Sequence, residues 1–252
     1  MIYRGENTGH IAPTAAEHSH LNLLSLLNLS DLQADDTAGR HGLGMVEGPD
    51  RASLSSARKS YELFQSNYCR LQENGITADT IRAIMQVEMN DYGIEDKVQD
   101  RAVCSRYAKM VLNEHSSVGP AQIQLRNFEE LKAKFPTELG NYNRCDLVNQ
   151  DVAALFIAAY LTKKVMDFEN GNFVMETKVN DKFKSIEIES VKQFWQRGGE
   201  DRARALILSF NPRLGGFTHE FNHDSAKYLR KVRAEMGIET TVTVISLPKK
   251  RK

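Results

Sequence analysis

The sequence predicts a mostly α-helical domain with one small β-hairpin, preceded by a loosely ordered extension. From Ser53 onward, apolar residues recur mainly at steps of three and four, which is typical of helices. Two stretches, FVMETKV and KFKSIEI, instead alternate in polarity around Asn180-Asp181, a turn signal for a hairpin. Residues 1–52 are rich in His, Asn, Asp, Thr and Gly. We therefore predict an extension over 1–52, serving delivery or partner docking, and one domain over 53–252.

Helical periodicity and capping signals define the predicted elements in order. The first helix, SARKSYELFQSNYCRLQENG, has Gly75 as its expected C-cap, and the second, TADTIRAIMQVEMNDYG, begins after Thr77. The last predicted helix has Asp224 as its cap at the start and ends at Gly237. TTVTVISL is β-branched and is predicted as a terminal or edge strand. The remaining helices are predicted over DKVQDRAVCSRYAKMVLNE, NFEELKAKF, DLVNQDVAALFIAAYLTKKVMDF, EDRARALILSF and DSAKYLRKVRAEMG.

Composition excludes several classes of function. Lys and Arg total 33, as do Asp and Glu, so a neutral chain presents no electrostatic footprint for nucleic acid. No stretch approaches the ~18 apolar residues of a membrane span. The three cysteines lie far apart and indicate neither a disulfide framework nor a zinc ribbon, although one bridge could form. We expect no cofactor, no nucleic-acid partner and synthesis in a reducing compartment.

One acidic residue, Glu88, shares the apolar face of the second predicted helix. It lies four residues after Ile84 and seven after Ile81, near the helix end. Burial disfavours the charged form of a carboxyl and raises its pKa, as a general acid working near neutral pH requires. Glycosidases use such a carboxyl to protonate the leaving oxygen. The alternative is that Glu88 turns to solvent at a frayed last turn.

Four motifs follow Glu88 along the chain: SSVGPAQIQL, VAALFIAAYLTKKV, ALILSFNPRLGG and AKYLRKVRAEM. In this order they resemble the motifs of the lytic transglycosylase and goose-type lysozyme superfamily, over roughly residues 78–236. The resemblance implies an α+β lysozyme-like fold and a muramidase that cleaves the β-1,4 bond between N-acetylmuramic acid and N-acetylglucosamine in peptidoglycan. Glu88 falls at the catalytic position, as general acid and then general base. The substrate-binding positions fall on Ser117, Gly119, Gln122, Tyr160, Phe210 and Asn211.

The residue types at these positions suit a glycan cleft. Gly119 allows a turn whose backbone approaches a sugar, and the amides of Gln122 and Asn211 can both donate and accept hydrogen bonds. The alternative for each amide is that it ties a loop. Phe210 departs from the family's tyrosine, so a hydroxyl contact is lost. The serine loop is compressed to Ser116-Ser117, which leaves open whether either serine contacts the acid.

The choice between lysozyme and lytic transglycosylase depends on a second carboxylate. A lysozyme can use one to activate water, whereas a transglycosylase lets the substrate's own 6-hydroxyl close an anhydro ring. Asp100 is our candidate to face the cleft, and the alternative is that it is a charge in the first turn of the next helix. We favour the single-acid, transglycosylase-type mechanism.

The stretch FTHEFNHD matches the H-E-x-x-H pattern of zinc peptidases, with His219 and His223 as ligands and Glu220 as base. A cap signal, Asp224, follows directly, so we predict a loop that runs into a helix start. There His219 or Glu220 could touch substrate without a metal. We predict no metal site, and a zinc metallopeptidase or a non-catalytic glycan-binding module are the alternatives to the muramidase.

The N-terminal stretch MIYRGENTGHIAPTAAEHSH lacks the charged-then-apolar order of a signal peptide. We therefore expect a protein made in the cytoplasm without a leader, which acts in the periplasm or cell wall after export. An antibacterial effector or a phage-type lysin fits this expectation. The expected partners are peptidoglycan glycan strands and, for an effector, a cognate immunity protein that plugs the cleft.

Overall fold

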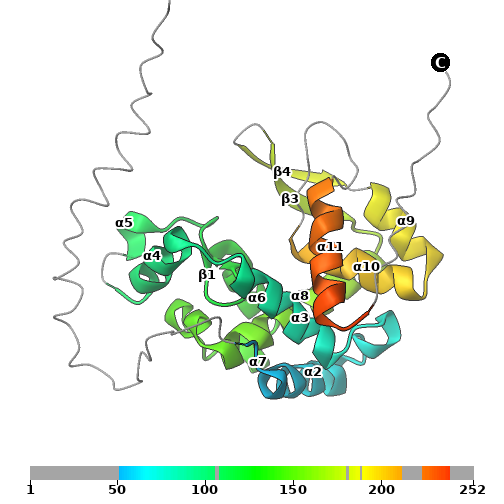
Figure 1. Cartoon of the computed structure of the whole chain (residues 1–252), viewed down its shortest axis with the longest axis horizontal. Helices are drawn as coiled ribbons and strands as arrows, with labels where there is room; N and C mark the ends of the chain where they lie inside the picture. Colours follow the sequence, from blue (N-terminus) through cyan, green and yellow to red (C-terminus); the bar gives the residue numbers. More distant parts are fainter. Residues whose placement is uncertain (1–50, 106–107, 180–181, 188, 212–222, 239–252) are drawn as a thin grey trace, which may run out of the picture. The chain divides into compact units, whose positions relative to one another are not determined.

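The computed structural model describes residues 51–105, 108–179, 182–187, 189–211 and 223–238 (Figure 1). Within these residues the fold is mostly α-helical with small antiparallel β-elements, which confirms the predicted class. The predicted extension over 1–52 lies outside the described residues except for its last two positions, and so does the predicted strand TTVTVISL.

Side-chain caps begin the first two helices, and the cap of the second, Thr77, is the predicted one. Helix α2 (Leu54–Tyr68) follows Ser53, whose hydroxyl accepts a hydrogen bond from the Ser56 N–H. Helix α3 (Ala78–Asn90) follows Thr77, which exchanges hydrogen bonds with Thr80 in a capping box.

Helix α2 ends earlier than predicted. Cys69 takes a left-handed φ of 52° and closes α2 with a hydrogen bond from its N–H to the Gln65 carbonyl. Gly75, the predicted C-cap, instead ends the short 3₁₀ helix η1 (Gln72–Asn74). The apolar residues at helical spacing continue past the point where the backbone turns, which is why the pattern overestimates the helix.

The next predicted helix is broken in two. Helix α4 (Ile94–Val103) ends at Cys104, and α5 (Ala108–Val111) is a single turn. A small hairpin follows, with β1 (Ser117–Val118) antiparallel to β2 (Ile123–Gln124). The chain then continues through α6 (Leu125–Lys134), α7 (Pro136–Leu139) and the 3₁₀ helix η2 (Arg144–Val148). The β1–β2 hairpin was not predicted, because strands of two residues are too short to show alternation.

Helix α8 (Gln150–Glu169) forms the centre of the core. Residues 153–162 are all buried, and the helix packs against α2, α3, α6 and α10 (Glu200–Phe210). A helix that is apolar all round needs neighbours on every side. Figure 1 shows α3, α8, α10 and α11 (His223–Glu235) meeting near the middle of the helical domain. Among the described residues, no helix combines the length and apolarity needed to cross a membrane.

The predicted β-hairpin is confirmed. Strand β3 (Val174–Val179) pairs antiparallel with β4 (Lys182–Glu187), and Val179 opposite Lys182 leaves a two-residue connection at the predicted turn. Helix α9 (Glu189–Arg197) was not predicted. Its buried face consists of Val191 and Trp195 alone, a stripe too short to stand out in the sequence.

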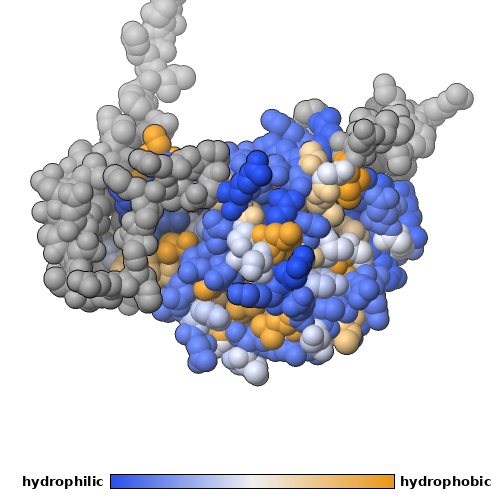
Figure 2. All heavy atoms as spheres, turned by 60° about the horizontal axis from the view of Figure 1, so that its bottom comes forward, coloured by the Kyte–Doolittle hydropathy of each residue, from blue (hydrophilic) through white to orange (hydrophobic). Residues whose placement is uncertain are grey.

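The described surface is largely hydrophilic on the face that Figure 2 shows, and its hydrophobic residues form small separate patches. Isolated apolar side chains of this kind are normal for a protein surface.

Candidate active site

Glu88 lies on the buried face of α3, as its spacing predicts. Ile81 and Ile84 on the same face are fully buried, and Glu88 itself is only 6% exposed although it belongs to the last turn of the helix. The alternative, in which the side chain turns out to solvent, is therefore wrong.

A hydrogen bond brings Glu88 together with a second predicted site residue. The side-chain amide of Asn211 donates from Nδ2 to Oε1 of Glu88 over 3.1 Å, across 123 positions of sequence. Asn211 is the C-cap residue of α10, where the main chain leaves the helix. Helix α10 packs on α8, and α8 in turn packs on α3. The core packing therefore sets the distance between the carboxyl and the amide.

Tyr160 and Phe210 support the same end of α10. The Tyr160 hydroxyl donates to the main-chain carbonyl of Ser209 over 2.8 Å, and the two aromatic rings pack edge to face with centroids 5.3 Å apart. Burial raises the pKa of Tyr160, so its hydroxyl stays a donor. Tyr160 is almost fully buried, and its hydroxyl is bound to the main chain that carries Asn211. Direct substrate binding by Tyr160 and Phe210 stays a prediction.

The other predicted substrate-binding residues gather in the β1–β2 hairpin. Ser117 lies in β1 opposite Gln124, and residues 119–122 form the turn. The turn is closed by a hydrogen bond from the Gln122 N–H to the Gly119 carbonyl over 2.9 Å. The Gln122 side chain donates from Nε2 to the same carbonyl over 3.1 Å, which is the loop-tying contact expected as the alternative to substrate binding. Ser116 precedes the strand, and its hydroxyl accepts from the Asn113 N–H.

The turn of the hairpin needs an unusual backbone at both ends. Gly119 has φ +76° and Gln122 has φ +49°, both in the left-handed region. A Cβ on Gly119 would overlap the carbonyl group of Leu147 in η2. Glycine is therefore required here both for its φ and for the close approach of another main chain.

Asp100 anchors this hairpin. Its Oδ1 accepts a hydrogen bond from the Gly119 N–H over 2.7 Å, and its Oδ2 accepts one from the Tyr92 hydroxyl. Burial raises the pKa of Asp100, and the two hydrogen bonds partly oppose this change. Asp100 is the seventh residue of α4, so the alternative that places it in the first turn of a helix is wrong. Both of its oxygens are engaged by the protein itself.

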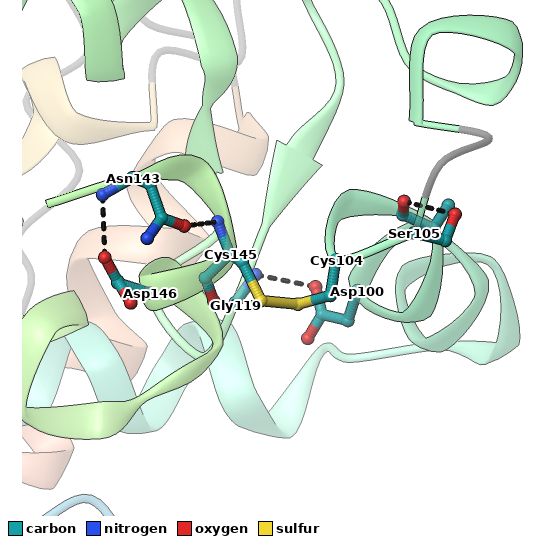
Figure 3. Close-up of a disulfide and its surroundings, with 8 residues drawn as sticks. Asp100, Cys104, Ser105, Gly119, Asn143, Cys145 and Asp146 are labelled. Atoms are coloured by element: carbon teal, nitrogen blue, oxygen red, sulfur yellow. Dashed lines mark hydrogen bonds between the residues drawn. A yellow bond between two sulfur atoms is a disulfide. The ribbon is translucent and has the colours of Figure 1, made fainter. Parts of the chain in front are cut away.

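A disulfide joins Cys104, the C-cap of α4, to Cys145 in η2 (Figure 3). The sequence shows three cysteines without a paired motif, and their spacing does not indicate which two would meet. Cys69 is the free cysteine and is exposed. The disulfide lies beside the hairpin, because Asp100 stands one helical turn before Cys104.

The H-E-x-x-H stretch lies mostly outside the described residues. Residues 212–222 are not described, and α11 begins at His223, close to the predicted start. Among the described residues, no group of three or more His, Cys, Asp or Glu side chains is placed to hold a metal ion. The zinc-peptidase alternative with His219, Glu220 and His223 therefore stays a prediction.

A cavity of about 410 Å³ lies along another face of α3. The helix contributes Arg82, Gln86 and Asn90, which follow one another at steps of four residues. Glu88, two positions from Gln86 and from Asn90, belongs to a different face and does not line this cavity.

Comparison with protein-family models, curated proteins and solved structures finds no significant match to this chain. The proposed function therefore rests on the geometry of the site and on the resemblance of its motifs.

Proposed function

We propose that the protein is a muramidase of the lytic transglycosylase type, which cleaves the β-1,4 bond between N-acetylmuramic acid and N-acetylglucosamine in peptidoglycan. The observation that carries the proposal is the pairing of Glu88 with Asn211. A nearly buried carboxyl at the end of an apolar helix meets an amide from a distant motif. Both residues fall at positions that the family resemblance assigns to the active site.

The proposed reaction uses Glu88 twice. As a general acid, it gives its proton to the glycosidic oxygen while the bond from that oxygen to the anomeric carbon breaks. The resulting carboxylate then accepts the proton of the 6-hydroxyl on N-acetylmuramic acid. The 6-oxygen bonds to the anomeric carbon and closes an anhydro ring, and Glu88 is protonated again. In a lysozyme, water would take the place of the 6-hydroxyl.

The contacts of Asp100 support the mechanism with a single acid. A carboxylate that activates water must direct a lone pair at that water, which requires an orientation set by the site and not by another contact. Both Asp100 oxygens instead accept hydrogen bonds from within the protein, from Gly119 and from Tyr92. We therefore assign Asp100 the role of holding the hairpin.

The hairpin and the end of α10 are the proposed contacts to the glycan. The N–H groups of Gly119 and Gln122 are bound within the protein. The proposed contacts of the hairpin to hydroxyl and acetamido groups of a sugar therefore come from its other polar groups, such as the Ser117 hydroxyl. Phe210 offers ring packing without the hydroxyl of a tyrosine. The proposed site of action is the periplasm or cell wall, where an effector would be opposed by an immunity protein that fills the cleft.

Mass spectrometry of the soluble products released from purified peptidoglycan tests this function. We expect muropeptides with 1,6-anhydro ends, and reducing ends would instead indicate a lysozyme. A metal chelator is expected to leave the release unchanged. Release of peptides without glycan cleavage, abolished by the chelator, would favour the zinc peptidase. Binding to peptidoglycan without any release would favour the glycan-binding module.

A further inference from the structure

The Cys104–Cys145 disulfide joins the two segments that hold the β1–β2 hairpin. On one side, α4 carries Asp100, which accepts the hydrogen bond from the Gly119 N–H (Figure 3). On the other side, η2 carries Leu147, whose carbonyl group occupies the place that a Cβ on Gly119 would take. Gly119 is thus held between two segments whose cysteines are 41 residues apart in sequence and covalently linked.

The hairpin depends on such outside support. Each strand has only two residues, and two cross-strand pairs make up the whole ladder. A two-stranded hairpin is at best marginally stable by itself in water. Its turn also contains left-handed residues at Gly119 and Gln122, and a non-glycine residue such as Gln122 adopts that conformation at some energetic cost.

Helix α4 is weakly packed apart from the disulfide. Of its ten residues, only Ala102 and Val103 are buried. Ile94 at its first position is 83% exposed. Few buried apolar contacts make a segment prone to local opening. The covalent bond at the C-terminal end of α4 is therefore a large part of what keeps Asp100 beside Gly119.

The disulfide is open to thiol exchange, because Cys104 is exposed and Cys145 is half-buried. Oxidation removes two electrons and two protons from the two thiols, and a disulfide-bearing oxidant takes them up and becomes a dithiol. A dithiol reductant reverses the step by the same exchange.

We propose that the Cys104–Cys145 pair is a redox switch for the hairpin, which is ordered for binding in the oxidised chain and loosened in the reduced chain. This inference rests on the proposed function in one respect, that the hairpin contacts the glycan. A chain made in a reducing compartment would then become fully competent only in an oxidising one, such as the periplasm.

Hydrogen exchange of the Gly119 amide tests the switch without reference to activity. The full chain is prepared with Cys69→Ser, which removes the third thiol, and is measured oxidised and after reduction. We expect the Gly119 amide to exchange at least about tenfold faster in the reduced chain, while amides within α8 keep their rates. An unchanged Gly119 rate would overturn the proposal. An equal acceleration in α8 would also overturn it, because the effect would then be global unfolding.

Muropeptide release gives the second readout. The Cys69→Ser protein is compared with the same protein carrying Cys104→Ser and Cys145→Ser, and with its own reduced form. We expect both to release fragments about tenfold more slowly than the oxidised protein at low substrate concentration. Measurable release at the same rate by all three would overturn the switch. If hydrogen exchange of the Gly119 amide depends on the redox state but none of the proteins releases muropeptides, the conformational switch stands and the proposed function is contradicted.

Discussion

The carboxyl of Glu88 lies where the apolar face of α3 meets the polar end of α10. Its helix neighbours Ile84 and Val87 are buried, so the carboxyl needs a polar partner that fixes its orientation. Asn211 provides one, through the hydrogen bond from Nδ2 to Oε1. Tyr160 holds the preceding main chain, which places the amide. We therefore regard Asn211 as a residue that orients the proposed acid.

Replacement of Asn211 by Ala tests this role. A hydrogen bond to a carboxylate contributes about 1.5–3 kcal/mol, so we expect kcat/KM for muropeptide release to fall roughly 10- to 100-fold. Asn90→Ala is a matched control, because Asn90 is an amide near the end of α3 that accepts a hydrogen bond from Gln86 instead. Equal activity of the two variants would show that Asn211 does not orient the acid.

At the scale of elements, the β1–β2 hairpin depends on a single glycine. Gly119 combines a left-handed φ with the close approach of the η2 main chain. Asp100 fixes the same residue through its N–H. A side chain at this position must displace either the turn or η2, and η2 is tied to α4 by the disulfide.

Gly119→Ala is expected to lower the free energy of unfolding by about 3 kcal/mol or more, because strain at positive φ adds to the main-chain overlap. Gly171→Ala is the matched control. Gly171 has φ +74°, and a Cβ there would meet nothing within 4 Å. We expect Gly171→Ala to lower the free energy of unfolding by only about 1 kcal/mol, because only the backbone conformation is strained. Urea unfolding of both variants measures the difference. Equal losses in the free energy of unfolding would mean that η2 moves aside at little energetic cost.

Local signals predict the elements that local interactions determine. Thr77 as a cap, the pairing of β3 with β4 and the bounds of α10 all follow from nearby residues. The break after Val103 and the left-handed end of α2 at Cys69 do not, because the helical pattern continues across both. The break in particular lies at the disulfide, which depends on a partner in η2.

At the scale of the whole molecule, the central helix α8 buries a charge. Lys164 is only 7% exposed and lies over the ring of Tyr160. Burial, together with the neighbouring Lys163, lowers the pKa of Lys164 to about 8, and Asp167 partly opposes this effect. The ammonium of Lys164 lies 3.8 Å from the Asp167 carboxylate, which also pairs with Lys163 at 3.0 Å.

Lys164 makes the stability of the fold depend on pH. Between about pH 8 and its ordinary value of 10.5, the unfolded chain binds a proton at Lys164 that the folded chain does not. The folded state therefore gains stability as the pH rises through this range. We expect the free energy of unfolding of wild type, relative to Lys164→Met, to increase by up to roughly 3 kcal/mol from pH 7.5 to pH 10.5. Parallel stability curves for the two proteins would contradict the lowered pKa.

The candidate site was predictable in part. The spacing of Ile81, Ile84 and Glu88 placed a carboxyl on the apolar face of one helix and left open whether it turns to solvent at the helix end; the structure shows it buried. The pairing of that carboxyl with Asn211 and the anchoring of the hairpin by Asp100 could not be predicted, because both depend on tertiary packing. Asp100 illustrates this limit, since it was expected to face the cleft and instead binds the main chain of Gly119.

The most direct test of the proposed function is the initial rate of muropeptide release by Glu88→Gln beside Asp91→Asn. Each change replaces a carboxyl at the end of α3 by its amide, but Asp91 is exposed and pairs with Lys231. General acid catalysis is worth about 10²–10⁴-fold, so we expect the Glu88→Gln rate to fall by roughly a thousandfold while Asp91→Asn stays within about twofold of wild type. Release by Glu88→Gln at the wild-type rate would mean that Glu88 is not the catalytic acid.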